Sequence, residues 1–350
     1  LGMVNQKSYL WTGIGALAGL GAGLGAALAG YAYWREPFDV RLDRLSLRLP
    51  NSRNSLPPEG LRILHLSDFH FRGAEPREQR KVERVKQCVA GLEYDLLIHT
   101  GDFLHYNEGM ANVLALLDVL PRPRLGAFAV MGNHDYAVYR MSKAVGYTWR
   151  NFVAKESRLG QGHPAHRTPT RQEQTRRYLR FLIHLLHNRI DGEPSGVNDV
   201  PRLRHELERR GMRVLHNCAI RLQTGGIDLF LAGVDDLQEG HPDLAAALAD
   251  VDDSAPLLLL SHNPDILQAP AAHRADLILA GHTHGGQIVL PFLGPAHTQT
   301  DILSRADASG HVYLGDTQLY ISRGLGEGIP LRFGAPPHIT LLTLLPEEEK

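Results

Sequence analysis

The chain has 350 residues and a hydrophobic content of 43%, which is enough for a sizeable core in one large or two ordinary domains and excludes wholesale disorder. Its 37 Lys and Arg residues balance 38 Asp and Glu residues, and this net charge of -1 excludes a polycation that coats nucleic acid. The only cysteines, Cys88 and Cys218, are far apart, which argues against a disulfide framework or a cysteine metal site.

Residues 8–34 contain no charged side chain and are mostly Leu, Ala, Gly and aromatic residues. A helix of this length crosses the ~30 Å hydrocarbon core of a bilayer, so we predict a single-pass membrane anchor over residues 1–36 and a second domain over residues 37–350. A cleaved signal peptide ending near Ala29, or a glycine-rich arm, are the alternatives. Four arginines follow the span and one lysine precedes it, which favours a cytoplasmic catalytic domain at a bacterial inner membrane.

Apolar runs of strand length then alternate with helical stretches, a pattern that predicts an α/β fold. The expected strands are Leu61–Leu66, Asp95–Thr100, Phe128–Met131, Ile227–Val234, Pro256–Leu260 and Asp276–Ala280. The expected helices between them cover Glu75–Gly91 and Met110–Leu120.

A basic segment interrupts this alternation, with eleven Lys and Arg against two Asp and Glu between Tyr139 and Arg189. We predict a partly helical cap insertion over residues 136–210, with a helix at 171–190 that carries Arg176 and Arg180 on one face and leucines on a neighbouring face. These arginines are candidate ligands for substrate phosphate or lipid headgroups, and a solvated helix packed on the body is the alternative. The small number of interleaved aromatic residues disfavours nucleic acid as the partner.

Polar clusters follow five of the apolar runs, at the point where each run ends. They are Asp68-Phe69-His70, Gly101-Asp102, Gly132-Asn133-His134-Asp135, Ser261-His262-Asn263 and Gly281-His282-Thr283-His284. Ligands of open α/β sheets bind at the carboxyl ends of strands, so these clusters mark a candidate site. Their carboxylate, imidazole and amide groups suit Mn²⁺, Fe²⁺ or Zn²⁺. Ser67 and Ser261 lie outside a G-x-S-x-G motif, which argues against serine-hydrolase chemistry.

The five clusters and their order resemble the motifs of the calcineurin-like metallophosphoesterase superfamily. Further stretches resemble the membrane-associated phosphoesterases of the YkuE/YaeI type, a group similar to the UDP-2,3-diacylglucosamine hydrolase of chlamydial lipid A synthesis. These stretches include Ala232-Gly233-Val234-Asp235-Asp236, His262-Asn263-Pro264-Asp265, Gly285-Gly286-Gln287, Ser322-Arg323-Gly324-Leu325-Gly326 and Leu331-Arg332-Phe333. The resemblance covers residues 36–345 and implies a β-sandwich flanked by helices.

The resemblance also implies a site for two divalent metal ions, with Mn²⁺ as the expected metal. Asp102 would bridge the ions; the remaining ligands would be Asp68, His70 and His284 on the first ion and Asn133, His262 and His282 on the second. His134 would stay free of metal and either stabilise phosphoryl oxygens or protonate the leaving oxygen, with Asp135 holding its ring.

Together, these observations predict a hydrolase that cleaves a phosphodiester or pyrophosphate bond in a lipid-linked substrate such as UDP-2,3-diacylglucosamine. A tethered phosphoesterase acting on soluble substrates and a non-catalytic scaffold are the alternatives. Two departures from the subfamily bear on the substrate: the basic insertion, and His338 at a position where this subfamily usually has Glu.

Overall fold

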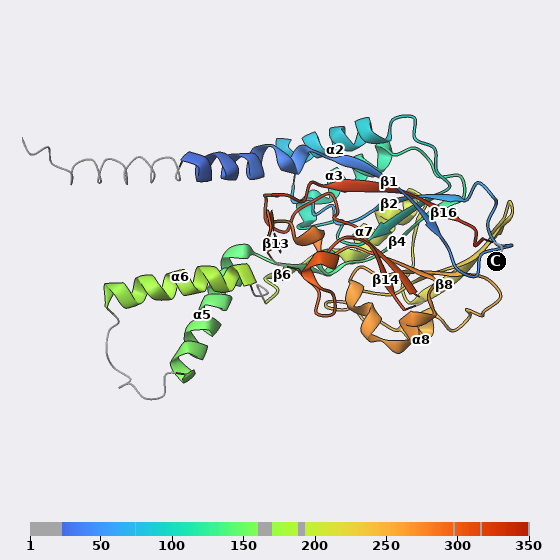
Figure 1. Cartoon of the computed structure of the whole chain (residues 1–350). Coiled ribbons are helices and arrows are strands. Elements are labelled where there is room, and N and C mark those ends of the chain that lie inside the picture. The colour runs from blue at the N-terminus through green and yellow to red at the C-terminus, as the bar shows by residue number, and fades with distance from the viewer. Residues whose placement is uncertain are drawn as a thin grey trace, which may run out of the picture.

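The computed structural model describes residues 23–348, apart from residues 74, 160–169, 188–192, 297 and 316. Two six-stranded sheets pack face to face, and helices cover both outer faces (Figure 1). The predicted mixed α/β sandwich with flanking helices is therefore confirmed.

Three of the five polar clusters predicted to bind metal follow strands of the first sheet. Its strands, in spatial order, are β1 (Arg41–Arg48), β16 (His338–Leu345), β2 (Leu61–Leu66), β3 (Leu96–Thr100), β4 (Gly126–Val130) and β7 (Met212–Val214). Helices α2 (Pro76–Val89), α3 (Met110–Val119) and α7 (Val200–Arg209) cover its outer face (Figure 1). Val85, Val113 and Leu203 from these helices are buried in one cluster with Leu64 and Leu97 of the sheet.

The other two predicted clusters follow strands of the second sheet. Its strands, in spatial order, are β14 (Gly310–Leu314), β15 (Thr317–Ile321), β11 (Leu277–Ala280), β10 (Leu257–Leu260), β9 (Ile227–Gly233) and β8 (Cys218–Thr224). Helix α8 (Leu244–Ala247) and the 3₁₀ helices η3 (Pro264–Gln268) and η4 (Pro270–Arg274) lie on its outer side. Ile266 and Ala272 of these turns pack against Leu259 and Ile278.

The core between the sheets follows from the period-two alternation of strand side chains. Ile63, Ile98 and Phe128 of the first sheet meet Leu229 and Leu258 of the second in one buried cluster. The central strands β2, β3 and β4 run parallel to one another, as do β9, β10 and β11, so the carboxyl ends within each group lie at a common edge.

All six predicted strands and both predicted helices of the body are present, with ends shifted by at most two residues. Short elements fill the connections at the carboxyl edges and elsewhere. They are α4 (Asn133–Tyr136), β12 (Val289–Leu290), β13 (Gly294–Pro295), η1 (Glu36–Phe38), η2 (Asn107–Gly109), η5 (His284–Gly286) and η6 (Arg305–Asp307).

The basic segment forms two helices, α5 (Met141–Leu159) and α6 (Arg171–His187), that stand away from the sheets (Figure 1). The strands β5 (Ala137–Val138) and β6 (Gly196–Val197) pair at their base. Of the predicted insertion 136–210, α7 belongs to the body, because Leu203 and Leu207 are buried in its core. The predicted helix residues 188–190 lie outside the described residues.

Residues 23–34 form a helix that ends beside the body. The backbone N–H of Arg332 donates to the carbonyl of Ala32 at 2.9 Å, and Arg77 donates to the carbonyl of Tyr33 at 2.6 Å. Among the described residues, no helix is both long and apolar enough to cross a bilayer. The predicted anchor 8–34 falls partly on residues 1–22, which lie outside the described part of the chain.

Candidate metal centre

The predicted ligands lie at the carboxyl edges of the two sheets in an unusual backbone conformation. Five of them have a positive φ: Asp68 (54°), His70 (47°), Asp102 (60°), His282 (70°) and His284 (53°). Non-glycine residues rarely adopt this left-handed region, and residues that do so cluster at functional sites where the surroundings hold them in place. The strands thus end in turns that direct side chains toward one place.

Asp102 lies at the centre of this cluster. Its Oδ2 atom is 3.1 Å from Nε2 of His70 and 3.2 Å from Nε2 of His262. Its Oδ1 atom accepts the backbone N–H of His134 at 2.8 Å, which fixes the orientation of the carboxylate. Asp102 therefore faces histidines from both sheets, the position that a bridging ligand needs.

Asp68 lies beside His70 and His284, with its Oδ1 atom 3.8 Å from Nε2 of each ring. The backbone N–H of His282 donates to both oxygens of this carboxylate, at 3.1 and 3.2 Å. Among the described residues, three groups of three ligand atoms are close enough to hold one ion each: Asp68, His70 and His284; Asp68, Asp102 and His262; and His70, His105 and His134.

The orientation of His262 is set by a hydrogen bond behind the ring. Its Nδ1 atom lies 2.7 Å from the carbonyl oxygen of Thr100, so Nδ1–H donates and Nε2 is left free to face Asp102. The Nδ1 atom of His282 lies 3.1 Å from the same Nε2. The structure therefore brings these two predicted ligands of the second ion together.

Glycines pack directly against the ligands. A side chain at Gly281 or Gly324 would overlap the carboxylate of Asp68, and one at Gly132 would overlap Asp102. Gly324 also has a φ of +68°. The glycines of the sequence motifs are needed because other backbone segments approach the carboxylates this closely.

The electrostatics of the cluster favour a bound cation. Burial opposes charge on Asp102, but His262 and His70 lower the pKa of this carboxyl well below its ordinary value. Burial likewise opposes charge on His262, whereas Asp102 raises the pKa of His262 to about 10. The Asp102 carboxylate therefore favours a positive charge beside it, which a divalent metal ion would supply.

Asn133 begins α4 and is buried. Its Oδ1 atom has no hydrogen-bond partner among the described residues, although buried polar atoms are normally paired. An unpaired buried amide oxygen on the residue before His134, whose backbone binds Asp102, suits a ligand of a divalent cation. The residues present therefore fit the dinuclear centre.

His134 and Asp135 have different environments. The ring of His134 lies 4.6 Å from that of His70 and 5.0 Å from that of Tyr139, and burial lowers the pKa of His134 to about 3, so its ring is neutral. The carboxylate of Asp135 instead accepts backbone N–H groups of Gly132, Asp102 and Leu104 at 2.9 to 3.0 Å. The prediction that Asp135 holds the His134 ring is wrong, because this carboxylate braces the ligand loops.

His105 is a buried member of the site that the sequence analysis missed. Its Nδ1 atom lies 3.4 Å from Nδ1 of His70, and its ring stacks on that of His134 at 4.8 Å. The available signal was its position three residues after Asp102, in the loop that leaves β3.

The loop from Ser322 to Gly328 is held by the fully buried Arg332. This guanidinium donates to the carbonyls of Arg323 and Ala335, both at 2.8 Å, and of Gly326 at 2.5 Å. His338, the departure from the subfamily pattern, also braces this loop, because its Nε2 accepts the backbone N–H of Arg323 at 2.8 Å.

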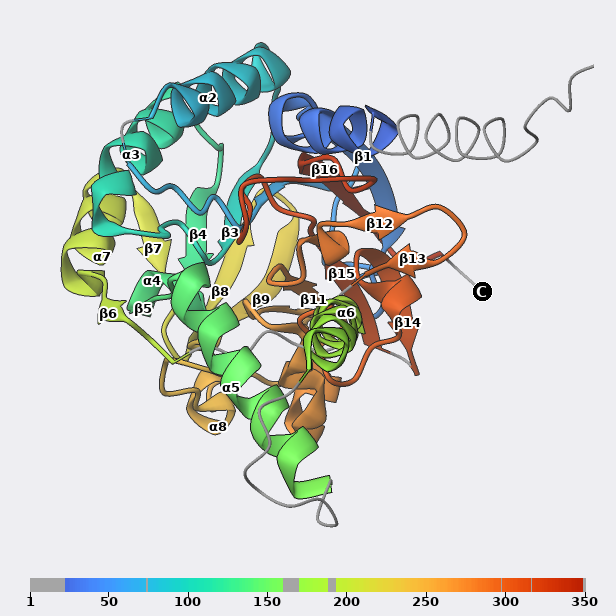
Figure 2. The same ribbon diagram turned by 90° about the vertical axis from the view of Figure 1, so that its left-hand side faces the viewer.

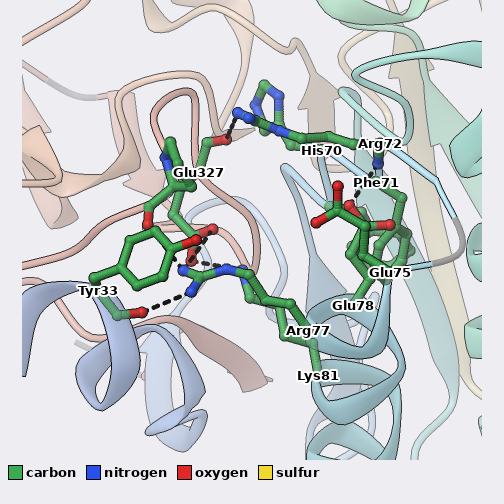
Figure 3. Close-up of a pocket in the computed structure, with 11 residues that line it drawn as sticks. Tyr33, His70, Phe71, Arg72, Glu75, Arg77, Glu78, Lys81 and Glu327 are labelled. Atoms are coloured by element: carbon green, nitrogen blue, oxygen red, sulfur yellow. Dashed lines mark hydrogen bonds and ion pairs between the residues drawn. The ribbon is translucent and has the colours of Figure 1, made fainter.

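A cavity of about 200 Å³ lies beside His70 (Figure 3). It is bounded by α2, by Tyr33 and by the loop carrying Glu327. Three cations line it, but Glu327 pairs with Lys81 at 2.5 Å, and Arg77 and Arg72 donate to backbone carbonyls. The cavity thus joins the metal centre to the end of the helix formed by residues 23–34.

The substrate residues predicted on α6 lie apart from this cluster. Arg176 and Arg180 are exposed on the helix, in the part of the chain that stands away from the sheets (Figure 1). Phe181 of α6 packs against Trp149 and Phe152 of α5, and Tyr178 stacks on Trp149 at 5.1 Å. Aromatic contacts therefore hold the two helices together.

Comparison with known proteins places these features in a family. Residues 61–286 match the model of the calcineurin-like phosphoesterases. The chain is 30% identical to the UDP-2,3-diacylglucosamine pyrophosphatase LpxG of Chlamydia muridarum, over 89% of this chain and 91% of that protein. It is 28% identical to the metallophosphoesterase YkuE of Bacillus subtilis, over 97% and 98% of the two chains, and 30% identical to the phosphodiesterase YaeI of Escherichia coli, over 90% and 92%. The chain therefore belongs to the calcineurin-like phosphoesterase family and is a metal-dependent phosphoester hydrolase.

Proposed function

We propose that this enzyme hydrolyses a phosphodiester or pyrophosphate bond in a lipid-linked substrate of the UDP-2,3-diacylglucosamine type, at a bacterial inner membrane and on its cytoplasmic side. The observation that carries the proposal is the full-length similarity to chlamydial enzymes named for that substrate. The exposed arginines and apolar side chains of α6 support it, because such a substrate has both a diphosphate and acyl chains.

The metal ligands fit two divalent ions, for which we propose Mn²⁺. In our assignment Asp102 bridges, Asp68, His70 and His284 complete the first position, and Asn133, His262 and His282 complete the second. Divalent cations bound there would supply an activated water and neutralise phosphoryl charge. The protein contributes fixed ligand directions, since Thr100 orients His262 and the backbone of His134 orients Asp102.

His134 has the geometry of a group that meets the substrate. Its side chain is only partly covered, and its backbone position is fixed by the donation to Asp102 Oδ1. A neutral imidazole presents one N–H, which favours stabilisation of a phosphoryl oxygen over protonation of the leaving oxygen. Asp135 acts indirectly, by holding the backbone of the loops that carry Asp102 and Asn133.

The substrate proposal is tested by comparing kcat/KM for UDP-2,3-diacylglucosamine and for the deacylated UDP-sugar with Mn²⁺. We expect the acylated substrate to be strongly preferred, because each buried methylene contributes about 0.8 kcal/mol. Replacing Arg176 and Arg180 by Ala should reduce turnover of the lipid substrate more than that of bis-p-nitrophenyl phosphate, which reaches only the metals.

The matched control is a double Ala variant of Arg204 and Arg209, which are exposed on α7 of the body. It should leave both reactions unchanged. Equal kcat/KM for acylated and deacylated substrates would favour a phosphoesterase acting on soluble substrates and would refute the lipid proposal.

A further inference from the structure

Large apolar side chains are exposed in only a few places on the described residues. Apart from Ile302 and Tyr313, all of them belong to the helix of residues 23–34, to α6 and the strand β6 at its base, or to the turn between β12 and β13. Monomeric soluble proteins rarely gather exposed apolar surface in this way, and where they do it marks an interaction site.

The turn between β12 and β13 is the most exposed of these places. Phe292 is 107% exposed and has a φ of +64°, and its neighbour Leu293 is 75% exposed. A strained backbone that holds an aromatic ring in solvent is unfavourable for the isolated protein, so it points to a contact that the ring makes elsewhere.

All three segments are connected to the metal centre. The strand β12 begins five residues after His284, and α5, which carries α6, begins six residues after Asp135. The base of the β12–β13 turn is tied to the helix of residues 23–34 through Phe333, whose carbonyl accepts the N–H of Val289 at 2.6 Å and whose ring contacts Tyr31. Figure 2 looks onto the side of the molecule that carries α6 and this turn.

The charge next to the apolar groups of α6 is mostly positive, although Glu173 in the first turn of this helix is also exposed. The helices α5 and α6 contain Lys143, Arg150, Lys155, Arg176 and Arg177, which are partly or fully exposed. Basic residues beside exposed aromatic and aliphatic side chains are the composition of surfaces that bind anionic bilayers. The helix of residues 23–34 is uncharged and exposes the apolar side chains of Leu24, Leu28 and Trp34.

We infer that these segments form one membrane-binding face, in which Phe292, Leu293 and the Leu179–Ile183 edge of α6 enter an anionic bilayer while the metal centre faces it. The biological role of this face rests on the proposed function, because a lipid-linked substrate could then reach the metal centre without leaving the membrane. Its evidence is the distribution of apolar and basic side chains alone.

The test places an environment-sensitive fluorophore on single cysteines at Phe292→Cys and Leu179→Cys, in the full chain with Cys88 and Cys218 replaced by Ser. The matched control is Ser254→Cys, which is exposed before β10 at the opposite end of the sheets. The protein is reconstituted with vesicles of phosphatidylcholine and phosphatidylglycerol in equal parts that contain a doxyl-labelled lipid quencher.

We expect blue-shifted emission and several-fold stronger quenching at positions 292 and 179 than at position 254. Quenching at 292 and 179 no greater than at 254 would overturn the inference, and quenching at 292 alone would remove α6 from the face and overturn it as stated. The readout requires no turnover, so failure of the proposed substrate in the kinetic test leaves this result independent.

Discussion

Replacing His134 by Ala tests whether this side chain contributes to the rate of hydrolysis without contributing to metal binding. Among the described residues, the imidazole makes ring contacts with His70, His105 and Tyr139, whereas the link to Asp102 runs through the backbone N–H of residue 134. The substitution keeps that N–H. We therefore expect His134→Ala to retain two metal ions per chain.

The expected loss is in the rate. Removing one preorganised donor to a developing phosphoryl charge costs roughly 10²-fold in kcat, which corresponds to about 2.7 kcal/mol of transition-state stabilisation. The free energy of unfolding should change little in comparison, because the ring is only partly buried and makes no structural hydrogen bond among the described residues.

The assay combines kcat for bis-p-nitrophenyl phosphate at saturating Mn²⁺ with elemental analysis of the purified variant. His311→Ala is the control, since it removes an imidazole that pairs with Gln318 outside the centre. Loss of metal from His134→Ala, or retention of full kcat, would refute the role assigned to the ring.

Three further variants test the groups around the ligands. Asp135→Asn replaces an acceptor of three backbone N–H groups, so it should lower the free energy of unfolding by roughly 2 to 3 kcal/mol in chemical denaturation and release metal. His105→Ala removes the partner of His70 Nδ1 and should weaken Mn²⁺ binding by roughly 10-fold or more in calorimetric titration, while His105→Asn, which keeps an acceptor, should restore part of the affinity. Burial lowers the pKa of His338 to about 4, so between about pH 4 and 6.5 the folded chain binds fewer protons than the unfolded chain. The wild-type free energy of unfolding should therefore fall by about 2 kcal/mol between pH 7 and 5 through this residue. The variant His338→Asn should not show this part of the loss. An unchanged pH dependence in that variant would show that His338 is not the titrating group.

The central strands and their ligands were predictable because each strand is a short, mostly apolar run and each ligand cluster begins where the run ends. Asp68, Asp102 and His262 all follow this rule. The edge strands carry no such signal. Strand β1 pairs with β16 through Arg41 and His338, which are distant in the sequence, and half of its side chains face solvent.

The function of Asp135 could not be predicted for a different reason. Its partners are backbone N–H groups, and these carry no residue-type signature in the sequence. The same holds for Arg332, which appeared only as part of a family motif until its carbonyl partners were visible. The place of α7 in the body could not be predicted, because the spacing of Leu203 and Leu207 indicates an amphipathic helix but not which surface covers its apolar face.

The predicted metal ligands and the segments that project from the body lie in different parts of the chain. Residues 61–286 match the family and contain every predicted metal ligand, yet residues 23–34 and the Phe292 turn lie outside that match. The helices α5 and α6 lie within it but project from a two-stranded base. Segments attached directly after ligand loops can differ without moving the ligands, because Asp135, Arg332 and close-packed glycines fix the backbone from behind. Substrate choice should therefore depend on these projecting segments, and hydrolysis on the sheet edges.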